Sequence, residues 1–217
     1  LAEDDRKIEV TELCRLELLP LLEALDQDDE HAFGEDFGRS GDLTVIAPMA
    51  IKRDLKRVVP FLVELRNVPF RSQEQILFFI VDRLPRLRAG RLDGRGNGQY
   101  LAEQAIYRYG AGRIEAVMIS QGWYLEVMPP FKARFEDDMI ALPRDRDVVD
   151  DLRAIEVIKG IPKIPDAKSG ENKDRHGDAA VALVMADSAC DTEGTEIDFT
   201  PVPNASKFRG KMEDDDD

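Results

Sequence analysis

The sequence predicts one α/β domain built on a mixed sheet, in which an antiparallel meander adjoins parallel strands and helices flank the sheet. Three observations predict it. Apolar, β-branched segments follow one another closely between residues 32 and 68, as in a meander. From residue 72 onward, helical and strand-like patterns alternate, as in parallel crossovers. The 217 residues are enough for one sizeable domain with its own core.

The elements before residue 72 are a helix and three strands. Residues 8–26 carry apolar residues at helical spacing interrupted by Pro20, which predicts a bent or two-piece helix. Acidic residues then separate this helix from the strands. The expected strands cover 32–36, 43–51 and 58–68.

After residue 72 helix and strand alternate. Ser72 is the expected N-cap of a helix that ends near Pro85. A strand then runs to Asp93, and a Gly-rich turn leads to a helix through about Tyr109. The later elements are a strand over 113–120, a mixed or helical segment over 124–137, a short helix over 147–154, a loop or hairpin over 159–175 and a last helix over 178–190.

These elements divide the chain into three parts. Residues 1–30 are interpreted as a linker helix from a further N-terminal domain, and residues 31–190 as the folded domain. Residues 191–217 lose the hydrophobic periodicity and end in a run of acids, which predicts a disordered tail.

The net charge of −14 is unevenly distributed along the chain. Residues 1–42 sum to −10, residues 43–180 to +3 and residues 181–217 to −7. The body is therefore mildly basic between two acidic ends. Because the local field steers a polyanion, the low overall pI does not exclude a nucleic-acid partner.

Cysteine content and hydropathy argue against two other classes of protein. Cys14 and Cys190 have neither the number nor the spacing of a disulfide framework or zinc site, which favours a reducing cytosol. No apolar run approaches the roughly 20 residues that cross a bilayer, and no signal-peptide pattern opens the chain. A soluble, intracellular protein without a membrane partner is expected.

Three acids in separate short motifs are the candidate catalytic residues. Asp36 and Asp93 each end an apolar strand before a glycine-containing turn, and Asp178 opens a helix with small residues in its first turn. Converging carboxylates of this kind can hold two divalent cations about 4 Å apart for phosphodiester hydrolysis. Ligation by oxygen alone favours Mg²⁺ or Mn²⁺ over zinc.

Each acid also has a purely structural interpretation. Asp36 begins a turn, Asp93 precedes Gly94 in a common turn dipeptide, and Asp178 can act as a helix cap. Their joint occurrence in suitable elements favours the metal site. The residues expected at most to support that site are Asp42, Asp174 and His176.

Basic residues gather around the Gly-rich turn after Asp93 and again before Asp178. Two such clusters near candidate metal ligands fit phosphate binding, although single charges of this kind are commonly just solvated. The glycines after Asp93 match neither GxGxxG nor GxxxxGK[ST], so no nucleotide-binding loop is predicted. The candidate DNA-binding residues are Arg91, Arg95, Lys163, Lys168, Lys173 and Arg175.

In this order, the motifs GEDFGRSGDLTVI (34–46), LDGRGNG (92–98) and RHGDAA (175–180) resemble the nuclease domain of the large terminase subunit of tailed bacteriophages. The resemblance covers roughly residues 30–190 and is greatest to Mu-like phages and prophages. It implies a ribonuclease H-like fold and an endonuclease that cuts double-stranded phage DNA during packaging with two Mg²⁺ or Mn²⁺ ions. It also implies that Asp36 contacts both metals, while Asp93 and Asp178 each complete one site.

The same resemblance implies partners, a location and one departure. The small terminase subunit and the portal protein are the implied partners, in the cytoplasm of the infected or lysogenic host. An ATPase motor normally precedes this domain, so cleavage by the domain itself should need no ATP, and the isolated domain is expected to be monomeric. The family often has a second acid directly before the third catalytic one; here that residue is Gly177, which leaves Asp174 or water to complete the ligation.

Two alternative functions stay open. A Holliday-junction resolvase or transposase would keep the fold, but a resolvase needs a dimer interface, which the acidic ends do not suggest. A catalytically weak module that docks on portal or DNA would use the acids only as turn and cap residues. Alanine at Asp36 separates the last alternative, because docking should survive that substitution and cleavage should not.

Overall fold

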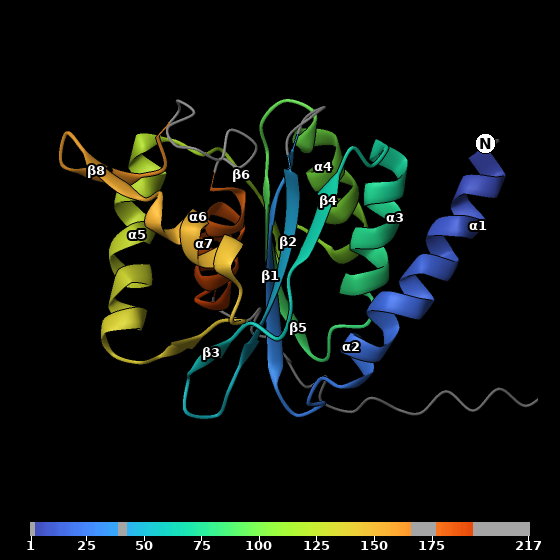
Figure 1. Ribbon diagram of the computed structural model, residues 1–217, viewed down its shortest axis with the longest axis horizontal. Helices are drawn as coiled ribbons and strands as arrows, with labels where there is room; N and C mark the ends of the chain where they lie inside the picture. The colour runs from blue at the N-terminus through green and yellow to red at the C-terminus, as the bar shows by residue number, and fades with distance from the viewer. Residues whose placement is uncertain (1–2, 39–42, 166–176, 193–217) are drawn as a thin grey trace, which may run out of the picture.

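The computed structural model describes residues 3–38, 43–165 and 177–192. A mixed sheet lies between two layers of helices (Figure 1). This arrangement confirms the predicted fold class.

The main sheet has seven strands in the described part of the chain. They are β1 (Glu30–Asp36), β2 (Leu43–Ile51), β3 (Arg57–Val58), β4 (Val63–Arg66), β5 (Leu87–Asp93), β6 (Ile114–Val117) and β7 (Ile140–Ala141). Their order is β6-β5-β1-β2-β3-β7, with β4 paired to β2. Strand β2 is antiparallel to β1, β3 and β4, whereas β5 is parallel to β1 and to β6. The meander and the parallel strands are therefore both present.

Helices cover both faces of this sheet (Figure 1). One layer holds α3 (Phe70–Val81) and α4 (Gly98–Tyr109), with α1 (Glu3–Leu13) outside α3. The other holds α5 (Gln121–Glu136), α6 (Arg146–Arg153) and α7 (Asp178–Cys190). A π-helical turn (Cys14–Leu18) and α2 (Leu19–Glu23) follow α1, and the hairpin of β8 (Glu156–Ile158) and β9 (Ile161–Lys163) packs beside α5.

Helix α7 is the centre of one core. Nearly all of its residues are buried, and most are small or aliphatic. Its close approach to β1 depends on Gly34, because a Cβ there would lie 2.1 Å from the carbonyl oxygen of Ala182. No side chain fits in that space, so glycine at this position lets the helix pack directly on the strand that ends in Asp36.

Charged side chains fix the other end of α7. The Arg134 Nε of α5 donates to Asp187 Oδ1 at 3.0 Å, and its Nη2 donates to the Asp191 carboxylate at 2.9 Å. Arg57 of β3 donates to the same Asp191 at 2.7 Å. Because Asp187 and Arg57 are buried, these pairs tie α5 and β3 to the C-terminal end of α7.

Two predicted elements before residue 85 have different boundaries in the structure. The single strand expected over 58–68 is divided into β3 and β4, because Pro60 lacks the N–H that a ladder requires. Helix α3 begins at Phe70 after Pro69, so the prediction of Ser72 as N-cap is wrong. The Pro69 carbonyl accepts from the backbone N–H of Ser72 at 2.9 Å, and Ser72 is buried within the helix.

Later elements agree more closely with expectation. The segment over 124–137 is helical as α5 and continues through Pro129 and Pro130. The carbonyls that lose helical donors there belong to Leu125 and Glu126, which are solvent-exposed. Strand β7 has only two residues, too few to give a periodic signal.

None of the helices in the described ranges is both long and apolar enough to cross a membrane. Cys14 and Cys190 are buried free thiols.

Candidate active site

The three candidate catalytic acids come from two neighbouring strands and the helix packed on them. Asp36 is the last residue of β1 and Asp93 the last residue of β5. These strands are parallel and pair Glu35 with Leu92, so Asp36 and Asp93 lie side by side at one edge of the sheet. Asp178 is the first residue of α7, which packs on both strands.

All three carboxylates are buried, with exposed fractions of 9% for Asp36, 5% for Asp93 and 7% for Asp178. Burial, followed by the charges of Asp178 and then Asp93, raises the pKa of Asp36 well above its ordinary value. Mutual repulsion of this kind arises only between carboxylates that lie close together. The structure thus brings these three acids to one place.

Asp93 is already paired with a cation from its own turn. The Arg95 Nε donates to Asp93 Oδ1 at 2.9 Å and its Nη2 donates to Oδ2 at 3.0 Å, and the Arg95 backbone N–H also donates to Oδ1 at 3.0 Å. This two-pronged pair fixes both oxygens of the carboxylate. The Arg95 charge also acts against the rise in the pKa of Asp36.

Glu35 is a fourth buried acid beside the site. Because strand neighbours point to opposite faces, its side chain lies on the α3 and α4 side of the sheet. Burial first, and the charge of Asp93 second, raise the pKa of Glu35 to about 8. Its Oε1 has no hydrogen-bond partner within the described residues. The sequence analysis did not select Glu35 as a site residue, although an acid inside an apolar strand is a signal in itself.

Asp151 is a second buried acid that the sequence analysis missed. It lies on α6, is 3% exposed, and its Oδ2 accepts from the backbone N–H of Ala179 at 3.1 Å. Residue 177, which precedes α7, is a glycine without a capping side chain, so Asp151 caps this helix from another element. Its position three residues after the buried Val148 was the available signal, because an acid on the apolar face of a helix is unusual.

The remaining predicted site residues divide into two groups. Arg91 is on β5 and pairs with Glu115 of β6 at 2.8 Å, and Lys163 is half-buried on β9. The others lie outside the described residues: Asp42, Lys168, Lys173, Asp174, Arg175 and His176.

The side chains gathered at this site are of the chemical type that binds a divalent cation. They offer only carboxylate oxygens, which are buried and repel one another, and a cation relieves that repulsion. Within the described residues, however, no three Asp, Glu, His or Cys side chains are arranged around a common point as a complete metal-binding group. The Arg95 guanidinium binds both oxygens of Asp93. It would therefore have to move away before Asp36, Asp93 and Asp178 could bind a metal together.

Comparison with known proteins places the chain among phage proteins. It is 43% identical over 216 residues to the Mu-like prophage FluMu protein gp28 of Haemophilus influenzae, which covers 99% of this chain and 42% of that protein. It is 45% identical over 212 residues to the probable terminase, large subunit gp28, of Escherichia phage Mu, covering 96% of this chain and 38% of that protein. The chain therefore spans about two fifths of the length of these curated relatives. No protein-family model matches it.

Solved structures agree with this placement at the level of the fold. The large terminase nuclease of the thermophilic phage G20c with bound magnesium has a TM-score of 0.60 at 19% identity, over 74% of this chain and 82% of that one. The Thermus phage P74-26 large terminase nuclease domain has a TM-score of 0.55 at 16% identity, over 74% and 80%. The chain is therefore a homologue of Mu-like large terminase subunits, and it has the ribonuclease H-like fold of the large terminase nuclease domain.

Proposed function

We propose that this chain is a divalent-metal-dependent endonuclease domain that cuts double-stranded phage DNA during genome packaging. One observation carries the proposal: Asp36, Asp93 and Asp178 are buried together where β1, β5 and α7 meet. Three carboxylates placed this way destabilise the metal-free protein by their mutual repulsion. A protein keeps such an arrangement when cations offset the repulsion.

In the proposed mechanism the three acids hold Mg²⁺ or Mn²⁺. Two such cations, when bound, would activate the attacking water and stabilise the leaving oxygen. The charges of both Asp178 and Asp93 act on Asp36 and help to raise its pKa, which suits Asp36 to be the ligand that both ions would share. Asp151 keeps Asp178 in position through its bond to the start of α7. The buried strand ends limit access of bulk water to the carboxylates.

Arg95 has two roles in this proposal. It neutralises Asp93 while the metal sites are empty, and on release its guanidinium is close enough to the acids to bind a DNA phosphate. Arg91 would have to leave Glu115 to do the same. Lys163, Lys168, Lys173 and Arg175 remain proposed phosphate contacts on the segment before Asp178, and Asp42, Asp174 and His176 remain proposed supporting residues.

The proposal also includes a wider setting for this domain. We expect residues 1–30 to connect this domain to an ATPase motor, residues 191–217 to form an acidic tail, and the isolated domain to be monomeric. Recruitment to the cutting site would depend on the small terminase subunit and the portal, in the cytoplasm of the host bacterium. The resolvase and transposase alternatives are less favoured, because the phage Mu relative at 45% identity is named a probable terminase.

Cleavage of supercoiled plasmid tests the proposal. The purified chain is incubated with Mn²⁺, Mg²⁺ or EDTA, without ATP, beside the variant Asp36→Asn. We expect nicking and linearisation that need the metal and fall at least 100-fold in the variant, since Asn cannot supply the negative charge that the cations require. The readout is the rate of loss of supercoiled DNA on agarose gels.

A matched control is Asp54→Asn. Asp54 follows β2 at the opposite edge of the sheet and accepts only from the exposed backbone N–H of Lys56, so this variant should cleave as the parent does. Cleavage that persists in Asp36→Asn would refute the assignment of this acid.

The structure also supplies one observation in favour of a docking module. Both carboxylate oxygens of Asp93 already accept from Arg95. Under that alternative, Asp36→Asn would leave DNA or portal binding unchanged and no metal would promote cleavage by the parent chain.

A further inference from the structure

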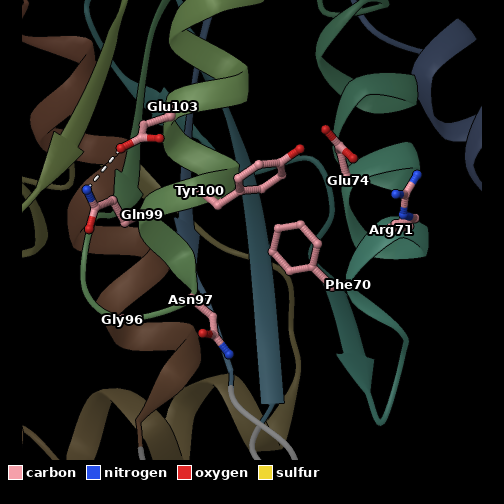
Figure 2. A pocket seen from close by; sticks show the side chains of 8 residues that line it. All are labelled: Phe70, Arg71, Glu74, Gly96, Asn97, Gln99, Tyr100 and Glu103. Carbon is pink, nitrogen blue, oxygen red and sulfur yellow. Dashed lines mark hydrogen bonds between the residues drawn. The ribbon is translucent and has the colours of Figure 1, made fainter.

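A pocket of about 560 Å³ lies between α3 and α4, next to the candidate active site (Figure 2). This volume falls within the roughly 300–1,000 Å³ of small-ligand sites. Its lining comes from the first two turns of the two helices and from the turn that follows Asp93: Phe70, Arg71, Glu74, Gly96, Asn97, Gln99, Tyr100 and Glu103.

The pocket lies close to the ends of the two strands that carry Asp36 and Asp93. Phe37 directly follows Asp36, and its ring meets the ring of Phe70 edge-to-face at 5.7 Å. Gly98 joins the same place to Asp93, because a Cβ at Gly98 would lie 2.4 Å from the Asp93 carbonyl oxygen and 3.2 Å from the Phe37 Cβ. A ligand in the pocket is therefore adjacent to the strand ends where cleavage is proposed.

Aromatic rings form the middle of the pocket. Phe70 meets Tyr100 edge-to-face at 5.4 Å, and Figure 2 shows the two rings extending toward each other from α3 and α4. Tyr100 is 52% exposed, so much of its ring is available to a ligand. Exposed rings beside a nuclease site are suited to stacking on nucleobases, which all present a flat π-face.

The charges around the rings favour a base inside and a phosphate at the rim. The carboxylates of Glu74 and Glu103 repel a phosphate, whereas a carboxylate can accept hydrogen bonds from base amino groups. One Glu103 oxygen already accepts from Gln99 Nε2 at 2.9 Å. Arg71 is exposed at the edge, where its pair with Glu3 at 3.1 Å is also exposed and therefore weak. Neither α3 nor α4 has an acid in its first turn, so the charge at the two helix starts does not oppose a phosphate.

We propose that this pocket binds an unpaired nucleotide of the DNA substrate, with its base stacked on Tyr100 and its backbone at the rim. A base inside a duplex already has both faces stacked, so the ligand must come from a gap, a frayed end or a single-stranded tail. This inference rests on the proposed function, from which it takes DNA as the class of ligand. It adds that the domain prefers DNA in which unpaired nucleotides adjoin a duplex.

Binding without cleavage tests this inference. Fluorescence anisotropy in EDTA compares a blunt duplex with the same duplex carrying a four-nucleotide tail, and 2-aminopurine in the tail reports stacking. We expect the parent chain to bind the tailed duplex more tightly and to quench 2-aminopurine. Tyr100→Ala should weaken binding to the tailed duplex about 5- to 100-fold, the range found when a stacking ring is removed, and leave the blunt duplex unchanged.

Two variants serve as controls. Tyr100→Phe keeps the ring and should keep both the preference and the quenching. Tyr107→Ala removes another exposed tyrosine of α4, which is 90% exposed and outside the pocket, and should change neither.

Equal affinity of the parent for the blunt and tailed duplexes would overturn the inference, as would an unchanged preference in Tyr100→Ala. The pocket would then be free for a protein partner. Absence of plasmid cleavage together with a Tyr100-dependent preference would instead overturn the proposed function while leaving the nucleotide site standing.

Discussion

At the scale of single residues, the pairing of Asp93 with Arg95 has a direct consequence for metal binding. A guanidinium that holds both carboxylate oxygens competes with any cation for the same lone pairs. We therefore predict that Arg95→Gln binds Mn²⁺ more tightly than the parent. Arg95 is about half exposed and such a pair stabilises by about 1 kcal/mol, which corresponds to an increase in affinity of about fivefold.

Titration of Mn²⁺ followed by electron paramagnetic resonance of the free ion measures this affinity without cleavage. Arg88→Gln is a suitable control, because Arg88 lies at the opposite end of the same strand and pairs with Glu30 at 2.8 Å. The prediction fails if Arg95→Gln binds Mn²⁺ no more tightly than Arg88→Gln.

The three candidate acids were selected from their local motifs, whereas the two buried acids beside them were not. Asp36, Asp93 and Asp178 each stand at the boundary of a regular element, and boundaries are visible in a sequence. Glu35 and Asp151 acquire their burial from tertiary packing, which periodicity does not record. The catalytic roles of Asp36, Asp93 and Asp178 stay predictions until the variants are measured.

At the scale of elements, the start of α7 depends on α6. Asp151→Ala removes the acceptor for the Ala179 N–H and leaves a buried donor without a partner. We expect the free energy of unfolding to fall by roughly 1–3 kcal/mol, measured by urea denaturation. Asp151→Asn keeps an acceptor oxygen and should lose less.

The neighbouring Asp150 provides the control for this experiment. It is exposed and pairs only across α6, at 3.6 and 3.7 Å, with Arg153 and Arg146. Asp150→Ala should change the unfolding free energy by less than about 0.5 kcal/mol. An equal loss in both variants would show that Asp151 has no special role at α7.

Elements with a strong local sequence pattern were predicted well. Elements that form only because they pair with another part of the fold were not. A continuous apolar run with β-branched residues located β2, and small apolar residues located α7, both at their observed bounds. Strand β7 exists because β3 offers it a parallel partner at Arg57 and Val58. Nothing within its own two residues signals that pairing.

At the scale of the whole molecule, burial of unpaired acids makes stability depend on pH. The folded pKa of Glu35 is raised from 4.5 to about 8, so in that window the folded protein keeps a proton that the unfolded chain releases. The free energy of unfolding should therefore fall as pH rises from about 4.5 to about 8, and the raised pKa of Asp36 acts in the same direction. At 1.36 kcal/mol for each pKa unit, the fall between pH 5.5 and 8 is on the order of 3 kcal/mol.

Urea denaturation in EDTA at the two pH values measures this fall. Glu35→Gln should be less sensitive to pH, because a neutral amide has no proton to lose. Glu126→Gln, at an exposed position on α5, should behave as the parent does. Stability that is constant or rises over this range in the parent chain would contradict the prediction.

The overall architecture was predictable because the order of strands and helices restricts the possible topologies. The side chains that complete the site come from four elements that are separated in sequence, β1, β5, α6 and α7, so their mutual distances depend on the packed structure. Residues 166–176, which include three of the six predicted DNA-binding residues, fall outside the described residues.

Helix α7 is held at both of its ends. Asp151 fixes its first turn, and Arg57 and Arg134 bind the acids at its last turn. Its translation along the sheet is thereby restricted in both directions. The axial register of Asp178 against Asp36 and Asp93 is thus set jointly by contacts at the two ends of this helix.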